Sequence, residues 1–236
     1  MTKFPSVWAI VPAAGAGRRM EADLPKQYLQ LNGQTLLQHT LSRVLDYPGL
    51  SGVVVVVAPG DQWVNDVADA FKESRLEVVT GGVERCHSVL NGLHALAARA
   101  AEHDWIMVHD AARPCVSHSD LDRLFAAIRD EPAGGLLGMP VRDTMKRAGA
   151  DSHVMETVDR DRLWHALTPQ VFRFQMLLEA LEGAIQTGVS VTDEAAAMEH
   201  AGHRPLMVEG RADNIKVTRP EDLDLAAFYL RQQEGE

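Results

Sequence analysis

A glycine-rich segment with two arginines follows the first apolar run of the sequence. The segment reads Pro12-Ala13-Ala14-Gly15-Ala16-Gly17-Arg18-Arg19-Met20, and Lys26 follows soon after it. Small residues let backbone N–H groups approach an anion closely, and Gly15 and Gly17 can adopt left-handed conformations. The pattern therefore predicts a phosphate-binding loop to which Arg19 and Lys26 add positive charge.

The segment departs from two common phosphate-binding patterns. The P-loop pattern G-x-x-x-x-G-K-[ST] is missing. The dinucleotide fingerprint needs a third glycine where Met20 stands, and the second apolar run ends at Ala58-Pro59-Gly60 without the acid that binds ribose. A dehydrogenase is therefore disfavoured, and a glycine-rich turn with solvated arginines is the alternative for this segment taken alone.

Two aspartates are candidate ligands for a divalent cation. Asp110 directly follows the apolar run Trp105–His109, and Asp213 lies near the C-terminal end. Mg²⁺ usually takes one or two carboxylates together with substrate phosphates, so both aspartates could approach Mg²⁺ or another divalent cation from two loops. The alternative for Asp110 is a hydrogen bond within its own turn or an ion pair with Arg113. His109 is expected to be a packed residue rather than a ligand.

The elements that would position these residues alternate along the chain. Nearly continuous apolar runs predict strands covered on both faces, at Val7–Val11, Val53–Val57, Glu77–Thr80, Trp105–His109 and Gly135–Met139. Amphipathic stretches predict helices at Leu36–Leu45, Gln62–Phe71, Cys86–Ala101, Leu121–Ile128, Phe174–Ile185, Glu194–His200 and Pro220–Arg231. This alternation indicates an α/β fold, Rossmann-like, with a mostly parallel sheet and flanking helices. Ligands of such sheets bind beyond the carboxyl ends of the strands.

One segment, residues 140–170, interrupts the alternation. It is polar and charged and has no clear helical period, but Val154–Val158 alternates like a strand. We expect a β-arm that leaves the main body, with a disordered loop as the alternative. The sequence shows neither an internal repeat nor a linker, so residues 1–236 are predicted to form a single domain with this arm.

The composition narrows the class of protein. The 236 residues carry a formal net charge of −10, which argues against nucleic-acid binding, although a few focused cations can still hold an anionic small molecule. The two cysteines suit a reducing compartment, and the N-terminus lacks the regions of a signal peptide. The longest apolar run, Val53–Ala58, is too short to span a bilayer. We therefore expect a cytoplasmic protein without a membrane partner.

Several separated motifs resemble those of a known enzyme family. The run P-A-A-G-x-G-x-R-M followed by P-K-Q is similar to the nucleotide loop of sugar-phosphate nucleotidyltransferases. Three further segments, 81–89, 108–114 and 212–218, resemble motifs of the 2-C-methyl-D-erythritol 4-phosphate cytidylyltransferases, and 157–160 and 168–170 match as well. Val83 departs from the pattern, because an acidic residue is expected there. Base selectivity is affected only if that side chain, rather than its backbone, contacts the base.

The resemblance implies an activity. A phosphate oxygen of 2-C-methyl-D-erythritol 4-phosphate would attack the α-phosphorus of CTP, release pyrophosphate and form 4-diphosphocytidyl-2-C-methyl-D-erythritol for isoprenoid precursor synthesis. Such a phosphate is mostly ionised at pH 7, so no general base is needed, and catalysis depends on positioning and charge neutralisation. The alternatives are a cytidylyltransferase for ribitol 5-phosphate or another polyol phosphate, and a nucleotide-binding module without turnover.

The resemblance also implies roles for individual residues. Arg19 and Lys26 would neutralise charge in the transition state. The nucleotide would be held by Ala13, Ala14, Gly15, Gly17, Gly82, Val83 and Ser88, although Ser88 could simply be a helix N-cap. The acceptor phosphate would be held by Arg160, Lys216 and Thr192, surrounded by Asp110, Arg113, Thr144 and Thr168. In this family the arm that carries Arg160 reaches across a homodimer, which places the acceptor site at the subunit interface.

Overall fold

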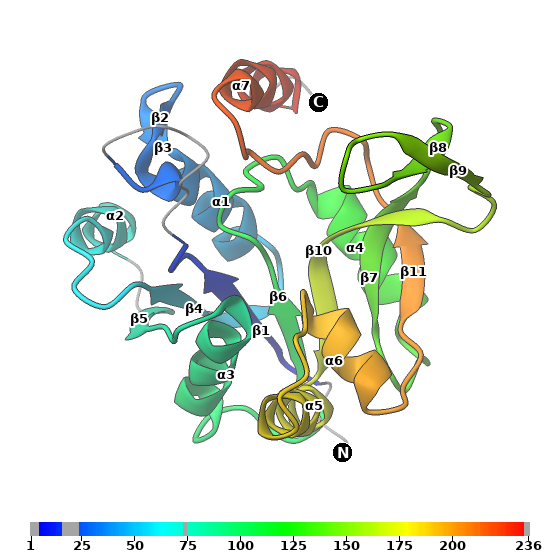
Figure 1. The fold of residues 1–236 in the computed structure, drawn as a ribbon. Helices are drawn as coiled ribbons and strands as arrows, with labels where there is room; N and C mark the ends of the chain where they lie inside the picture. The colour runs from blue at the N-terminus through cyan, green and yellow to red at the C-terminus, as the bar shows by residue number, and fades with distance from the viewer. Residues whose placement is uncertain (1–4, 16–23, 73–74, 234–236) are drawn as a thin grey trace.

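A seven-stranded sheet forms the centre of the computed structural model, which describes residues 5–15, 24–72 and 75–233 (Figure 1). In spatial order its strands are β11 (Leu206–Glu209), β7 (Gly135–Pro140), β10 (Trp164–Arg173), β6 (Trp105–Val108), β1 (Val7–Pro12), β4 (Leu50–Val57) and β5 (Leu76–Thr80). Only β10 runs antiparallel to its neighbours within this sheet. The predicted α/β fold with a mostly parallel sheet is confirmed.

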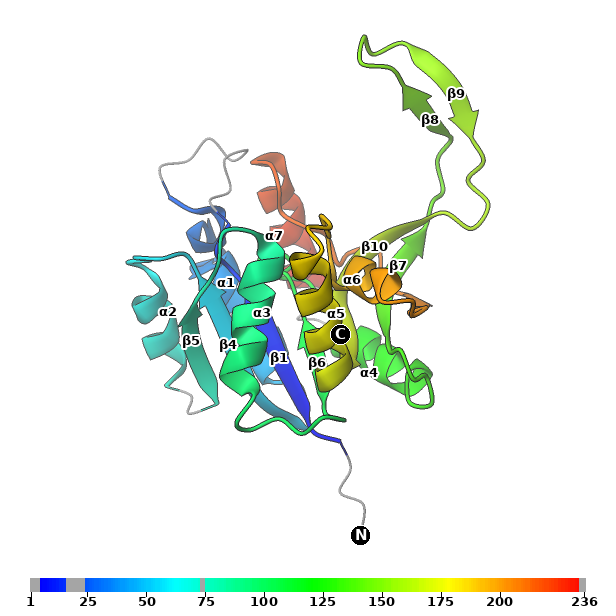
Figure 2. The ribbon, with the colours of Figure 1, turned by 60° about the horizontal axis from the view of Figure 1, so that its bottom comes forward.

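Helices cover both faces of the sheet (Figure 2). One face packs against α1 (Leu36–Leu45), α2 (Val64–Phe71) and α4 (His118–Ala127), and the other against α3 (Arg85–Leu96), α5 (Phe174–Gln186) and α6 (Glu194–His200). Along β4, Val53 and Val55 join the first core while Val54 and Val56 join the second. Because successive side chains of a strand point to opposite faces, this burial explains the unbroken apolar run in the sequence.

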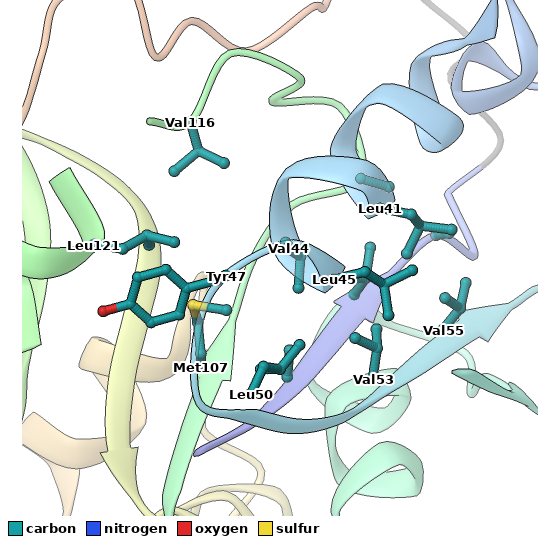
Figure 3. Close-up of a cluster of buried hydrophobic side chains, with 14 of the residues drawn as sticks. Leu41, Val44, Leu45, Tyr47, Leu50, Val53, Val55, Met107, Val116 and Leu121 are labelled. Atoms are coloured by element: carbon teal, nitrogen blue, oxygen red, sulfur yellow. The ribbon is translucent and has the colours of Figure 1, made fainter. Parts of the chain in front are cut away.

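Figure 3 shows how α1 closes the first core. Leu41, Val44 and Leu45 of the helix lie over Val53 and Val55 of β4, and all of these side chains are buried. The helix begins with a capping box: the Thr35 hydroxyl accepts from the Gln38 N–H at 3.1 Å, and the Gln38 side chain accepts from the Thr35 N–H at 2.7 Å. Both contacts satisfy amides that the first helical turn leaves unpaired.

The segment 140–170 differs from the expected arm in its extent. A hairpin of β8 (Met145–Ala148) and β9 (Val154–Val158) projects from the body (Figure 2), but β10 returns to the centre of the sheet. The apolar pattern of β10 is interrupted by Thr168, Pro169 and Gln170, where a cis peptide bond joins Thr168 to Pro169 and the register shifts. Because the sequence around this interruption is polar, the buried strand β10 was not predicted.

The sequence analysis also failed to predict three short strands and placed some helix ends wrongly. The missed strands are β2 (Gln30–Leu31), β3 (Gln34–Thr35) and β11, and a short 3₁₀ helix, η2 (Lys26–Tyr28), precedes them. Helix α7 (Glu221–Gln233) packs over β2 in a third apolar cluster, and α3 ends at Leu96 rather than at residue 101. Among the helices of the described residues, none has the length and hydropathy needed to cross a bilayer.

Candidate active site

Four loops meet at the carboxyl edge of the parallel strands and enclose a cavity. They follow β1, β5 and β6, and the fourth precedes α7. The residues that line the cavity are Pro12, Ala13, Ala14, Gly15, Lys26, Gln27, Gly82, Val83, Glu84, Arg85, Ser88, Asp110, Ala111, Ala112 and Lys216. This is where an open α/β sheet binds its ligand, and the cavity collects most of the residues predicted for the nucleotide.

The loop after β1 is fixed by hydrogen bonds at its start. The Ala13 N–H donates to the Val56 carbonyl at 2.7 Å, and the buried Gln27 side chain donates to the Ala13 carbonyl at 2.6 Å. Lys26, beside Gln27 on η2, donates to the Val217 carbonyl at 3.1 Å. These bonds hold the small residues at the cavity wall. Two predicted members of the loop, Gly17 and Arg19, lie outside the described residues.

The turn after β5 requires glycine at two positions. An added Cβ at Gly81 would lie 2.6 Å from the Ser88 hydroxyl oxygen, and one at Gly82 would lie 2.4 Å from the His87 Cβ. Ser88 does not cap α3, because the helix begins at Arg85 with Glu84 as its N-cap. Its hydroxyl instead accepts from the Gly82 N–H and donates to the Glu84 carbonyl, both at 3.2 Å. Ser88 therefore holds the turn closed.

Three basic side chains surround the carboxylate of Asp110. Lys216 Nζ lies 2.7 Å away, Arg85 3.2 Å and Arg113 3.9 Å, so the ion pair considered for Arg113 is the longest of the three. Burial alone would raise the pKa of Asp110, but the charges of Arg85 and then Lys216 hold it well below its usual range. Asp110 is therefore ionised at every pH at which the protein would work.

Arg85 is a site residue that the sequence analysis did not single out, although it lies in the quoted segment 81–89. Its guanidinium donates to both carboxylate oxygens of Glu194, at 2.6 and 3.0 Å, and to Asp110. Burial opposes its charge, but Glu194 and then Asp110 outweigh this effect and raise the pKa of Arg85. Burial is also the largest influence on Glu194 and raises the pKa of that carboxyl. Arg85 thus links α3, the β6 loop and α6 at the cavity floor.

A chain of hydrogen bonds behind the cavity fixes the loop after β6. His109 is fully buried, as predicted, and burial lowers its pKa to about 4, so the ring is neutral at pH 7. Its Nε2 lies 3.0 Å from the Arg113 carbonyl, which can only accept, so Nε2 carries the proton. The Thr168 hydroxyl therefore donates to Nδ1 at 3.0 Å and accepts from the Asp110 N–H at 3.0 Å. The network orients Asp110 from behind.

The predicted acceptor residues occupy several places. Lys216 lines the cavity, while Arg113 and Thr168 are buried directly behind it. Thr192 is exposed just before α6. Thr144 and Arg160 lie in the projecting arm, where Arg160 donates to the Arg142 carbonyl and borders a second cavity formed by residues 140–141 and 159–164. The described chain therefore brings Lys216, but neither Arg160 nor Thr144, to the first cavity.

The two predicted cation ligands have different surroundings. Asp110 presents an ionised carboxylate to the cavity, which suits a hard cation that also binds phosphate oxygens. Asp213 does not line the cavity; its carboxylate pairs with Arg211 at 2.8 Å and accepts from Gln233 at 3.0 Å. Asp110 thus fits Mg²⁺ as one ligand beside a polyphosphate, whereas Asp213 would first have to give up these partners.

Comparison with known proteins agrees with this geometry. The profile of the family described as 2-C-methyl-D-erythritol 4-phosphate cytidylyltransferase matches residues 7–232. Enzymes of that name from Aeromonas hydrophila and Pseudomonas entomophila are 54% and 53% identical over 97% and 98% of this chain, and 91% and 97% of their own lengths.

Solved structures support the same family. A crystal structure of 4-diphosphocytidyl-2C-methyl-D-erythritol synthase superposes with a TM-score of 0.84 at 38% identity, covering 97% of this chain and all of that one. The 2-C-methyl-D-erythritol 4-phosphate cytidylyltransferase of Francisella tularensis superposes with a TM-score of 0.82 at 34% identity, covering 95% and 99%. The chain belongs to the 2-C-methyl-D-erythritol 4-phosphate cytidylyltransferase family.

Proposed function

We propose that this protein transfers the cytidylyl group of CTP to the phosphate of 2-C-methyl-D-erythritol 4-phosphate. The observation that carries the proposal is the cavity at the carboxyl edge, where a small-residue loop, a glycine turn and the cations Lys26, Arg85 and Lys216 face one space. The family match over residues 7–232 and relatives above 50% identity support the same activity.

The reaction joins two polyanions. An oxygen of the acceptor phosphate forms a bond to the α-phosphorus of CTP, the bond from that phosphorus to the β-phosphate bridge breaks, and pyrophosphate leaves. The acceptor phosphate is already largely ionised at pH 7, so the protein needs to position both substrates and neutralise charge. Lys26 and Arg19 act on the triphosphate, and Lys216 lies where the two substrates meet.

In this scheme Asp110 positions Lys216 and the β6 loop, and it also binds the divalent cation. Its ion pair with Lys216 at 2.7 Å fixes the ammonium group at the cavity, and the hydrogen bond from its N–H to Thr168 fixes the loop. Mg²⁺ or another divalent cation, bound by Asp110 and the substrate phosphates, would neutralise further negative charge. Asp213 is proposed as a more distant ligand that acts through water.

The base is read by the turn after β5. Ala14, Gly82, Val83 and Ser88 line the cavity, and the base would meet the backbones of the first three and the hydroxyl of Ser88. Since the Ser88 oxygen accepts one bond and donates one, it retains a lone pair for an amino group such as that of cytosine. Val83, 96% exposed, offers no polar side-chain atom, so contact at this position is through the backbone.

The acceptor site is completed by a second subunit. Arg160 and Thr144 stand on an arm that projects from the body, and its β9 residues Val154 and Met155 are 63% and 71% exposed. Exposed apolar side chains on a projecting hairpin suit burial against a second copy of the chain. We place this homodimer in the cytoplasm, because both cysteines are free thiols.

The experiment that tests the function is incubation with CTP, Mg²⁺ and one polyol phosphate at a time, followed by pyrophosphate detection and mass analysis. We expect a cytidine diphosphate ester of 2-C-methyl-D-erythritol and no product from ribitol 5-phosphate. If ribitol 5-phosphate were the only acceptor to give a product, it would be the acceptor in place of 2-C-methyl-D-erythritol 4-phosphate. If CTP bound but no acceptor led to pyrophosphate release, the transferase activity would be refuted.

A further inference from the structure

Three side chains at the start of α3 have their metal-binding atoms close together. Within residues 5–15, 24–72 and 75–233, Glu84, Cys86 and His87 form the one group of at least three His, Cys, Asp or Glu ligands within 4.8 Å of one another. Cys86 Sγ lies 3.6 Å from His87 Nδ1 and 3.7 Å from Glu84 Oε2, and the last two atoms are 3.8 Å apart. We call these residues the α3 triad.

The spacing of the α3 triad suits a tetrahedral ion. Zinc bonds of about 2.3 Å to sulfur and about 2.0–2.1 Å to nitrogen or oxygen, at tetrahedral angles, place the ligand atoms about 3.3–3.6 Å apart. Of the three separations, the one of 3.6 Å lies at the upper end of this range, and those of 3.7 and 3.8 Å lie just above it. A thiolate, an imidazole and a carboxylate are together a ligand set for Zn²⁺, whereas Mg²⁺ prefers oxygen ligands alone.

Charge and access also permit an ion. The helix N-terminus carries partial positive charge, but the Cys86 thiolate and the Glu84 carboxylate would balance a divalent cation. Arg85 is held away from the triad by Glu194 and Asp110. Cys86 is buried, His87 is partly exposed and the Glu84 side chain is 67% exposed, so an ion can enter from solvent while the thiolate anchors it.

We propose that the α3 triad is a binding site for one soft or borderline divalent cation of the Zn²⁺ class, and that occupancy weakens CTP binding. Cys86 loses its proton to solvent on binding, and the fourth position stays open to water. Glu84 lines the nucleotide cavity, and the His87 Cβ packs against Gly82 of the base-reading turn. An ion held by both side chains therefore restrains the wall that contacts the nucleotide, so the wall can no longer adjust to CTP. This second effect rests on the proposed function; the binding of the ion does not.

The first experiment is a titration of the chelator-treated full chain with Co²⁺, which reports a thiolate ligand by its charge-transfer absorption. We expect one Co²⁺ per chain, displaced by Zn²⁺ and not by millimolar Mg²⁺. Cys86→Ala should abolish the absorption, and His87→Asn should weaken binding by more than the roughly 10–100-fold that losing an outer partner of a ligand costs. Cys115→Ala and His94→Asn are matched controls, because Cys115 lies in the third apolar cluster, beside α7, and His94 lies on a later turn of α3. Circular dichroism checks that each variant is folded.

The titration needs no substrate, so its result is independent of the transferase activity. An absence of the absorption in the wild type, its persistence in Cys86→Ala, or its loss in Cys115→Ala would overturn the site. With saturating Mg²⁺ and the acceptor, micromolar Zn²⁺ should raise the KM for CTP several-fold in the wild type and leave Cys86→Ala unaffected. An equal rise in both proteins would overturn the effect on CTP.

Discussion

Replacing Arg85 by methionine should reveal how strongly the cavity floor depends on one buried ion pair. Glu194 is 1% exposed in its side chain, and both of its oxygens accept from Arg85. Removing one partner of a buried pair leaves an uncompensated charge and costs about 3–5 kcal/mol. Asp110 still keeps Lys216 at 2.7 Å, so the cost falls on Glu194. We expect the free energy of unfolding to drop by about 3–5 kcal/mol, a large part of the about 5–15 kcal/mol of a typical protein.

The pH dependence of this loss gives a second readout. Burial raises the pKa of Glu194, and Arg85 is the first group that opposes the rise, so the Arg85→Met variant should raise this pKa further. A carboxyl whose folded pKa exceeds its unfolded value stabilises fully below the unfolded pKa and loses that contribution as pH rises through the folded pKa. The deficit of Arg85→Met should therefore be largest near pH 7–8 and shrink as the pH falls towards the unfolded value of about 4.3. Urea unfolding followed by circular dichroism, at several pH values, measures both effects.

A double-mutant cycle separates the pair from the packing around it. Glu194→Met should cost less than Arg85→Met, because Arg85 is 28% exposed and keeps Asp110. Arg85→Met with Glu194→Met leaves no buried charge at this position, so it should recover much of the stability lost by Arg85→Met alone. A loss below about 1 kcal/mol for Arg85→Met, or strict additivity in the cycle, would refute the reasoning.

Three further predictions concern the substrates. Lys26→Ala and Arg19→Ala should each lower kcat by about 10²–10³ without unfolding the protein, and a near-normal kcat in steady-state assays would remove them from the transition state. Arg160→Glu should raise the KM for the acceptor far more than the KM for CTP; equal changes in the two constants would contradict an acceptor role. Gly82→Ala should weaken CTP binding, measured by calorimetry, because its Cβ would lie 2.4 Å from His87 Cβ; unchanged affinity would show that the turn does not contact the nucleotide.

Local sequence patterns predicted the strands and helices whose buried apolar residues recur with a regular period. The strand Val53–Val57 and the helix Leu36–Leu45 were recognisable because their apolar positions follow one period without interruption. The strand β10 escaped because Thr168, Pro169 and Gln170 interrupt its apolar residues. Thr168 and Gln170 are buried because they form hydrogen bonds with distant segments, Thr168 with Asp110 and Gln170 with Asp193, and such long-range contacts leave no periodic trace.

The same distinction applies to the site. Glycine, arginine and lysine near the end of the first strand allowed a phosphate-binding loop to be predicted, since that chemistry is local to one loop. The partnership of Arg85 with Glu194 joins residues 109 positions apart and exists only because α3 and α6 lie on the same face of the sheet. Nothing in the sequence around Glu194 distinguishes it from the first-turn acid of an ordinary helix.

The acidic residues that pair with the cations of the cavity explain how a protein with a net charge of −10 can hold two polyanions. Asp110 and Glu194 form ion pairs with Lys216 and Arg85 and so fix the positions of those cations. A lysine that is free to move must lose side-chain entropy when it meets a phosphate, by up to about 2 kcal/mol, whereas one already paired has lost much of it on folding. The pairing also weakens the attraction between these cations and the substrate phosphates, since each carboxylate offsets positive charge. The pairing still favours catalysis, because cations that are fixed before the reaction need not reorganise as charge develops on the transferred phosphorus.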